Sequence, residues 1–148
     1  MAEEGKIDLE KSVREYLPEL PVDKQSVKMI HLVQNTAGFR QPEPQELRHT
    51  LFANLQNGIS TFINDTLLFA PGDYFFESDL NYDLLGAIIE RATNKPFSEI
   101  LSEVLSDTLH LKSTVCDDPL LIIPNRSNCF ERNIVARPIM APTFDNRQ

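Results

Sequence analysis

The run between residues 78 and 94 constrains the fold most, because apolar residues recur in it at helical spacing. Ser78 and Asp79 are suited to cap the start of a helix, and Asn94 stands where a C-cap is expected. Such an apolar stripe is stable only when other elements cover it. The sequence therefore predicts a core helix here. The positions predicted to face inward are Tyr82, Leu85, Ile88, Ile89 and Ala92.

Four other segments have helical patterns. A helical turn is expected to begin near Asp8 and to be stopped by Pro18. A second helix is expected to end at the Thr36-Ala37-Gly38 turn, a third to be interrupted by Gly58, and a fourth to start near Pro96. The predicted apolar faces are Val27, Ile30, His31 and Val33 in the second, Leu47, Leu51, Phe52 and Leu55 in the third, and Phe97, Ile100, Leu101, Val104, Leu105 and Leu109 in the fourth.

The pattern changes after Leu111, where short β-branched or apolar runs alternate with Pro, Asn and Asp. Runs of this kind are typical of short strands and loops. The predicted fold class is therefore α+β, helix-rich over residues 1–111 and extended over residues 112–148. A chain of 148 residues has the size of one ordinary domain and can bury roughly 70% of its unfolded surface.

Composition and charge exclude several classes of partner. The chain is 41% hydrophobic and 24% charged, with a net charge of −8 and a pI near 4.8. Without a basic stripe, nucleic acids and anionic membranes would be repelled. No apolar run approaches the ~18 residues that a membrane span needs, and the acidic N-terminus has neither a signal-peptide nor a transit-peptide pattern. We expect no nucleic-acid partner and no membrane span.

Tests for catalytic and cofactor motifs are negative. No serine is followed by lysine three residues later, so no S-x-x-K pair places an amine beside a hydroxyl on one helix face. His31, His49 and His110 lie too far apart for a helical metal-binding pair, and the five glycines are too scattered for a phosphate loop. Cys116 and Cys129 are too few for a disulfide framework or a zinc site. We expect no metal or cofactor, and structural histidines.

Three stretches resemble the serine β-lactamase and penicillin-binding-protein family. "EEGKIDLEKSVREYLPELP" resembles the segment that follows the nucleophile helix in that family, and "IHLVQNTAGF" is similar to its H-L-L-x-H-T-S-G turn. "PGDYFFESDLNYDLLGAIIE" resembles its P-G-x-x-F-x-Y-S-N-x-x-Y-x-L-L-G-x-I-I-E run. The likeness covers most of residues 3 to 146 and is strongest to the animal mitochondrial branch. It implies a helical region beside a mixed α/β domain and, for the full-length protein, acyl-enzyme chemistry on a peptide or acyl substrate.

The departures from the family pattern are as informative as the matches. Glu77 and Asp79 stand at the positions of the family's Tyr-x-Asn motif, whose phenol and amide take part in proton transfer and substrate binding. A carboxylate is a poor replacement for the phenol, because it is shorter and ionised at neutral pH. The resemblance also implies that residues 1–148 form one partial domain without the nucleophile helix or the C-terminal active-site strand. No intact catalytic residue is therefore expected in this chain.

Alternatives remain open for both the carboxylates and the function. Glu77 and Asp79 could be a general acid/base pair or a weak cation site, but the reading we favour is that Ser78 or Asp79 caps a helix with an acidic first turn and that Glu77 is solvated. The chain is either a segment of a serine hydrolase or peptidase, inactive by itself, or a non-catalytic module for binding or self-association. A mitochondrial location is implied only by the resemblance, and a cytoplasmic one is the default otherwise.

Overall fold

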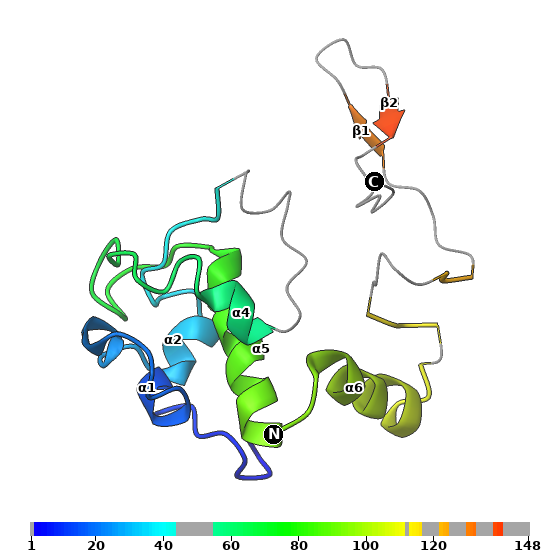
Figure 1. The fold of residues 1–148 in the computed structure, drawn as a ribbon, viewed down its shortest axis with the longest axis horizontal. Coiled ribbons are helices and arrows are strands. Elements are labelled where there is room, and N and C mark those ends of the chain that lie inside the picture. The colour runs from blue at the N-terminus through cyan, green and yellow to red at the C-terminus, as the bar shows by residue number, and fades with distance from the viewer. Residues whose placement is uncertain are drawn as a thin grey trace. The chain divides into compact units, whose positions relative to one another are not determined.

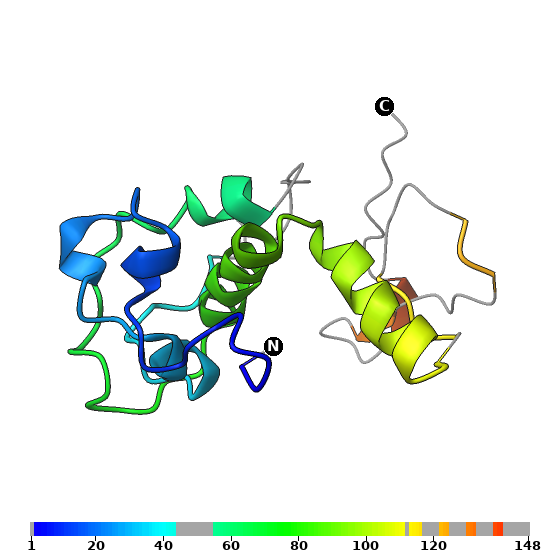
Figure 2. The same ribbon diagram turned by 90° about the horizontal axis from the view of Figure 1, so that it is seen from below.

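The computed structural model describes residues 2–43, 55–111, 113–116, 122–124, 130–132 and 138–140, as two units that meet in sequence between Ile100 and Leu101. In the first unit, α1 (Val13–Tyr16), α2 (Met29–Val33) and α4 (Leu55–Ile59) all contact α5 (Asp79–Thr93), as Figures 1 and 2 show. The predicted core helix is therefore present and central. Its fully or almost fully buried apolar residues are Leu80, Leu84, Ala87 and Ile88.

The inward face of α5 differs from the predicted stripe. Tyr82 is 52% exposed and Ala92 is also at the surface, so placing these two in the core was wrong. The predicted stripe and the buried stripe both have helical spacing. The buried stripe includes the polar residue Asn81, so it is not recognised as apolar from the sequence. The contacts of α2 and α4 decide which stripe is covered.

The two ends of α5 follow the sequence only in part. Asn94 adopts the left-handed conformation (φ 54°, ψ 34°) and forms the predicted C-cap. Ser78 occupies the N-cap position in an extended conformation, but its hydroxyl donates to the carbonyl of Arg40 and makes no capping hydrogen bond. The start of α5 is therefore fixed by a tertiary contact.

Helix α4 lies against α5 where Gly86 leaves room. A Cβ atom at Gly86 would be 2.6 Å from Leu55 Cδ1. The Glu90 carboxylate accepts the backbone N–H of Leu55 (3.2 Å) and that of Phe97 (2.9 Å), so it links α4 to the start of α6 (Phe97–Ser102). Gly58 lies in the last turn of α4, which ends one residue later at Ile59, close to the predicted interruption. The predicted apolar positions Leu47, Leu51 and Phe52 lie outside the described residues.

The two N-terminal helices are shorter than predicted. Helix α1 begins at Val13 and not near Asp8, because the Ser12 hydroxyl caps it by accepting the N–H of Arg14 (3.3 Å). Helix α2 ends at Val33, before the predicted glycine turn, since Asn35 already adopts a positive φ of 55°. Val33, predicted to face inward, is 40% exposed. Instead, Met29 and Leu32 are buried.

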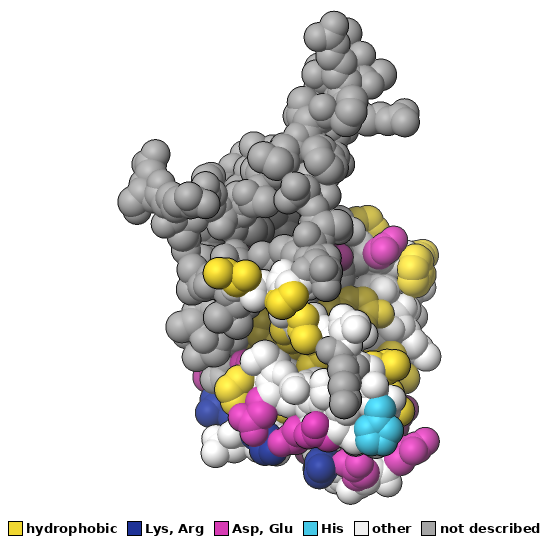
Figure 3. All heavy atoms as spheres, turned by 90° about the vertical axis from the view of Figure 1, so that its right-hand side faces the viewer, with side chains coloured by type: hydrophobic (Ala, Val, Ile, Leu, Met, Phe, Trp, Pro, Cys, Tyr) yellow, Lys and Arg dark blue, Asp and Glu magenta, His cyan; other side chains and the backbone are white. Residues whose placement is uncertain are grey.

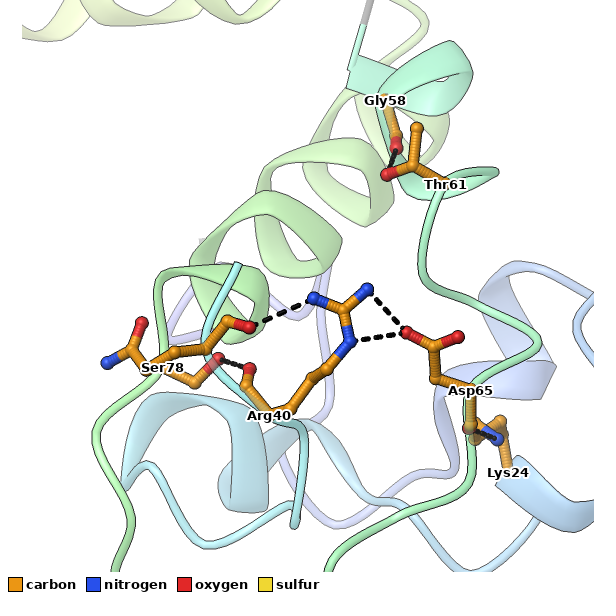
Figure 4. A network of polar contacts seen from close by, with 7 residues as sticks. Lys24, Arg40, Gly58, Thr61, Asp65 and Ser78 are labelled. Carbon is orange, nitrogen blue, oxygen red and sulfur yellow. Dashed lines mark hydrogen bonds and ion pairs between the residues drawn. The ribbon is translucent and has the colours of Figure 1, made fainter. Parts of the chain in front are cut away.

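A polar network ties the loop after α2 to the loop after α4. Arg40 binds the Asp65 carboxylate through Nε and Nη2, both at 2.7 Å, and Ser78 contacts the Arg40 carbonyl (Figure 4). The fully buried Lys24 donates to the Asp65 carbonyl (2.9 Å) and pairs with Asp23. These bonds satisfy a buried ammonium that would otherwise be costly.

In the second unit, a π-helical segment (Glu103–Thr108) continues directly from α6. The predicted stripe is only partly covered: Val104 and Leu109 are exposed, whereas Ile100, in the first unit, is buried. The other three members, Phe97, Leu101 and Leu105, are half-buried. Beyond residue 112, β1 (Phe130–Arg132) pairs antiparallel with β2 (Pro138–Met140), with Phe130 opposite Met140.

On the face drawn in Figure 3, apolar and acidic side chains of the described residues adjoin one another at the surface. Among the described residues, no helix is long and apolar enough to cross a membrane.

Gly38 provides a test of the contact between its loop and residues 67–69. It has a φ of 89°, and a Cβ there would be 2.5 Å from the carbonyl oxygen of Phe69. Gly5 has a similar φ of 70° but open space around it, so it is a matched control. Gly38→Ala should lower the free energy of unfolding by roughly 3 kcal/mol and Gly5→Ala by about 1 kcal/mol, measured by urea denaturation. Equal losses would show that the close approach is absent.

His31 predicts a dependence of stability on pH. Its Nδ1 accepts the N–H of Lys28 (3.2 Å), and partial burial, followed by the charge of Lys28, lowers the pKa of His31 from its ordinary value of 6.5. Below pH 6.5 the unfolded chain takes up a proton that the folded chain resists, so stability is lost as the pH falls through this range.

His31→Asn is the matched variant, because its Oδ1 can accept the same N–H without titrating. Between pH 7.5 and 5.5 the free energy of unfolding should fall further in the unaltered protein than in the variant, measured by urea denaturation at each pH. Parallel curves would show that His31 contributes nothing to the dependence.

Candidate functional site

The turn after α2 and the loop before α5 are joined by backbone hydrogen bonds. Phe76 donates its N–H to the carbonyl of Asn35 (2.9 Å), and Gly72 donates to the carbonyl of Thr36 (2.8 Å). These are the two regions that carry the turn and Tyr-x-Asn resemblances. The fold therefore brings together motifs about 40 residues apart in sequence.

A buried amide pair supports this junction. Asn35 Oδ1 accepts the N–H of Ser78 (3.3 Å) and the Nδ2–H of Asn81 (2.8 Å). The positive φ of Asn35 suits this position, because asparagine tolerates the left-handed conformation better than most residues. Asn81 is fully buried, and its Oδ1 has no hydrogen-bond partner among the described residues. The pair holds the backbone that presents Glu77 and Asp79.

Glu77 and Asp79 both reach the surface. Glu77 is fixed through its backbone, since its carbonyl accepts the Nε2–H of Gln41 at 2.5 Å. Asp79 is the first residue of α5, where a negative charge is favoured by the helix dipole. Neither carboxylate has an ion pair or hydrogen bond to any described residue. The role of these two positions as a degenerate catalytic motif remains a prediction.

Asp83 adds a third carboxylate one turn after Asp79. Partial desolvation, and then the like charge of Asp79, raise the pKa of Asp83 although its side chain touches solvent. Two carboxylates at this spacing on one helix face repel each other. The start of α5 therefore concentrates negative charge that nothing in the described part of the chain neutralises.

The serines that the structure buries are engaged with carbonyl groups. Ser12 Oγ donates to the carbonyl of Gln25 (2.8 Å), and Ser78 Oγ to that of Arg40. The buried ammonium of Lys24 is held by Asp23 and Asp65. Neither buried hydroxyl is hydrogen-bonded to a lysine amine of the described residues. Among the described residues, no group of three His, Cys, Asp or Glu side chains could hold a metal ion.

Sequence reasoning missed Asn35 and Asn81. Asn35 lies within the turn that resembles the family motif, but no role was predicted for it or for Asn81. A usable signal was present, because Asn81 interrupts the stripe formed by Leu80, Leu84 and Ile88. A polar residue within an apolar stripe is usually buried with a hydrogen-bond partner. His31 was predicted to be structural, and its hydrogen bond to Lys28 agrees with that.

The amide pair predicts unequal costs for its two members. Asn35→Gly keeps the left-handed backbone but leaves two buried donors unsatisfied, so it should lower the free energy of unfolding by roughly 2–3 kcal/mol. Asn81→Leu removes the unpartnered oxygen and extends the apolar stripe, so it should cost less than about 1 kcal/mol. Urea denaturation measures both. A larger loss for Asn81→Leu would indicate a partner for its Oδ1.

Comparisons with known proteins agree with this geometry. The sequence profile described as Beta-lactamase matches residues 1–143. The mitochondrial serine beta-lactamase-like protein LACTB of Mus musculus is 33% identical over 95 residues, which cover 64% of this chain and 17% of that protein. The chain thus spans less than a fifth of this curated relative.

Solved structures show the same fold. A penicillin-binding protein from Bacillus halodurans is similar over 94% of this chain and 44% of its own, with a TM-score of 0.79 and 16% identity. An octameric penicillin-binding protein homologue from Pyrococcus abyssi is similar over 95% and 34%, with a TM-score of 0.77 and 17% identity.

The profile covers nearly the whole chain, and the junction of the turn after α2 with the start of α5 carries the matching motifs. The chain therefore belongs to the β-lactamase family, the group of serine hydrolases that includes the penicillin-binding proteins.

Proposed function

We propose that residues 1–148 are a segment of a β-lactamase-related serine hydrolase or peptidase and do not catalyse acyl transfer by themselves. The observation that carries this proposal is the state of Glu77 and Asp79. Both stand where the family has Tyr and Asn, and both are exposed without a partner among the described residues. Family membership supports the lineage, and the altered motif supports the loss of activity.

The absence of an activated serine hydroxyl is the chemical reason why no acyl transfer is expected. A serine hydroxyl attacks an acyl group only when a neighbouring base removes its proton. The 148 residues contain no S-x-x-K pair, and the buried hydroxyls of Ser12 and Ser78 donate to backbone carbonyls. Carboxylic acids as a class ionise far more readily than phenols, so Glu in place of Tyr is poorly suited to pass a proton in the same way.

The arrangement of the domain belongs to the same proposal. We assign residues 1–111 to the helix-rich part of one α+β domain and residues 112–148 to its extended part. The helices of the first unit and the short β1–β2 pair support this division. A mitochondrial location is proposed for the full-length protein because the mouse relative is a mitochondrial protein. A peptide or acyl substrate is proposed because the chain belongs to a serine hydrolase family.

A non-catalytic role in binding or self-association is the second candidate. It is favoured by large apolar side chains at the surface of the first unit, among them Tyr74, Phe75 and Tyr82. Contiguous apolar surface on a soluble protein commonly marks an interaction site. The octameric homologue from Pyrococcus abyssi supports self-association as one form of this role.

Labelling with a fluorophosphonate probe tests the inactive assignment. The 148-residue chain should show no covalent labelling of any serine and no turnover of nitrocefin or an acyl ester, because no hydroxyl is activated. An active serine β-lactamase, labelled in parallel, is the positive control.

The double variant Glu77→Tyr/Asp79→Asn restores the family motif and should remain unlabelled, since the missing element is the nucleophile and not the phenol alone. Labelling of a serine in either form, located by mass spectrometry, would overturn the proposal.

A further inference from the structure

We propose that an acidic–aromatic surface binds a basic, apolar segment of another polypeptide. The surface consists of Phe75, Phe76, Glu77, Asp79, Tyr82 and Asp83, and all six side chains are exposed. The inference gives a partner class to the non-catalytic binding role and rests on that role. It does not depend on whether any serine reacts.

The unpaired carboxylates are the first argument. Some other carboxylates of the first unit face cations at close range, as in Glu10 with Lys28 and Asp65 with Arg40. Glu77, Asp79 and Asp83 have no cation among the described residues. The repulsion between Asp79 and Asp83 would be relieved by a positive charge from a partner, so charge complementarity favours a basic one.

The exposed aromatic side chains are the second argument. Phe75 is 70% exposed and Tyr82 is 52% exposed, and both lie within eight residues of all three carboxylates in sequence. Aromatic faces provide apolar contact area and also attract ammonium and guanidinium groups. A partner that alternates Lys or Arg with apolar residues satisfies both kinds of side chain.

The surface is also held in place before a partner arrives. The N–H groups of Phe76 and Ser78 are bonded to Asn35, and the carbonyl of Glu77 is bonded to Gln41. Asp79, Tyr82 and Asp83 share a face of α5, where the Tyr82 hydroxyl donates to the Val33 carbonyl (3.4 Å). Little conformational entropy is lost when such a surface binds, which favours affinity.

Two other partner chemistries fit less well. A divalent cation needs several oxygen ligands at once, and no group of three His, Cys, Asp or Glu among the described residues could supply them. A nucleic acid or an anionic membrane would be repelled by the three carboxylates and by the net charge of −8. A polypeptide that combines positive charge with apolar side chains remains.

Binding of synthetic peptides to the complete 148-residue chain tests the inference by fluorescence anisotropy. The probe alternates Arg with Leu. One control peptide replaces Arg with Glu, and the other replaces Leu with Ser. The Arg–Leu peptide should bind at least about tenfold more tightly than either control, and its affinity should fall as salt is raised. Equal binding of the Glu–Leu peptide would overturn the proposal, as would displacement of the probe by calcium at constant ionic strength.

Matched variants locate the binding. Glu77→Gln/Asp79→Asn should weaken binding of the Arg–Leu peptide by about tenfold and flatten its salt dependence, and Phe75→Ser should weaken it at every salt concentration. Glu3→Gln/Asp107→Asn removes the same charge from two other exposed positions and should change the affinity less than about twofold.

All these side chains are exposed, so urea denaturation should show unchanged folding in every variant. Equal losses in the two double variants, or no effect of Phe75→Ser, would overturn the proposal. The fluorophosphonate experiment fails or succeeds independently, because it reports a covalent reaction and this one reports reversible binding.

Discussion

The side-chain oxygen of Asn35 is the point on which the architecture around α5 depends. It accepts one hydrogen bond from the backbone at Ser78 and another from the side chain of Asn81. The Asn35 carbonyl accepts a third bond, from Phe76. Because one residue supplies both acceptors, the turn after α2 and the entry to α5 cannot move apart without exposing buried donors to an apolar core. The direction of α5, and with it the position of the exposed carboxylates, follows from this turn.

A close contact between the backbone at Gly38 and residues 67–69 also holds the loops of the first unit together. Because Gly38 has no Cβ, its backbone can lie close to the carbonyl of Phe69. The N–H of Leu68 donates to the Gly38 carbonyl (2.7 Å). Arg40 binds the carboxylate of Asp65, and Lys24 donates to its backbone carbonyl. Short helices such as α1 and α2 are marginal alone, so these loop contacts, together with packing on α5, maintain their arrangement.

The sequence predicted elements well and their faces less well. The C-cap at Asn94 was predicted correctly, because helices often end at a residue in the left-handed conformation and asparagine, like glycine, tolerates that conformation. Tyr82 and Val33 were misplaced because a wide apolar stripe leaves the helix rotation undetermined until its neighbours are known. The Asn35–Asn81 bond joins residues 46 positions apart, and no local pattern encodes such a contact. The sequence motif of the candidate site could be predicted, but the buried asparagine pair that holds its backbone could not.

The proposed exchange of a family phenol and amide for the carboxylates of Glu77 and Asp79 would change what this part of the fold can do. A phenol works in a catalytic cleft because it can hold or release a proton there without a permanent charge. A carboxylate carries its charge at neutral pH, and at Glu77 and Asp79 that charge is unbalanced within the described residues. The backbone beneath them is nevertheless held by the same turn that carries the family resemblance. A preserved scaffold with permanent negative charge beside exposed aromatic rings is better suited to holding a cationic partner than to moving a proton.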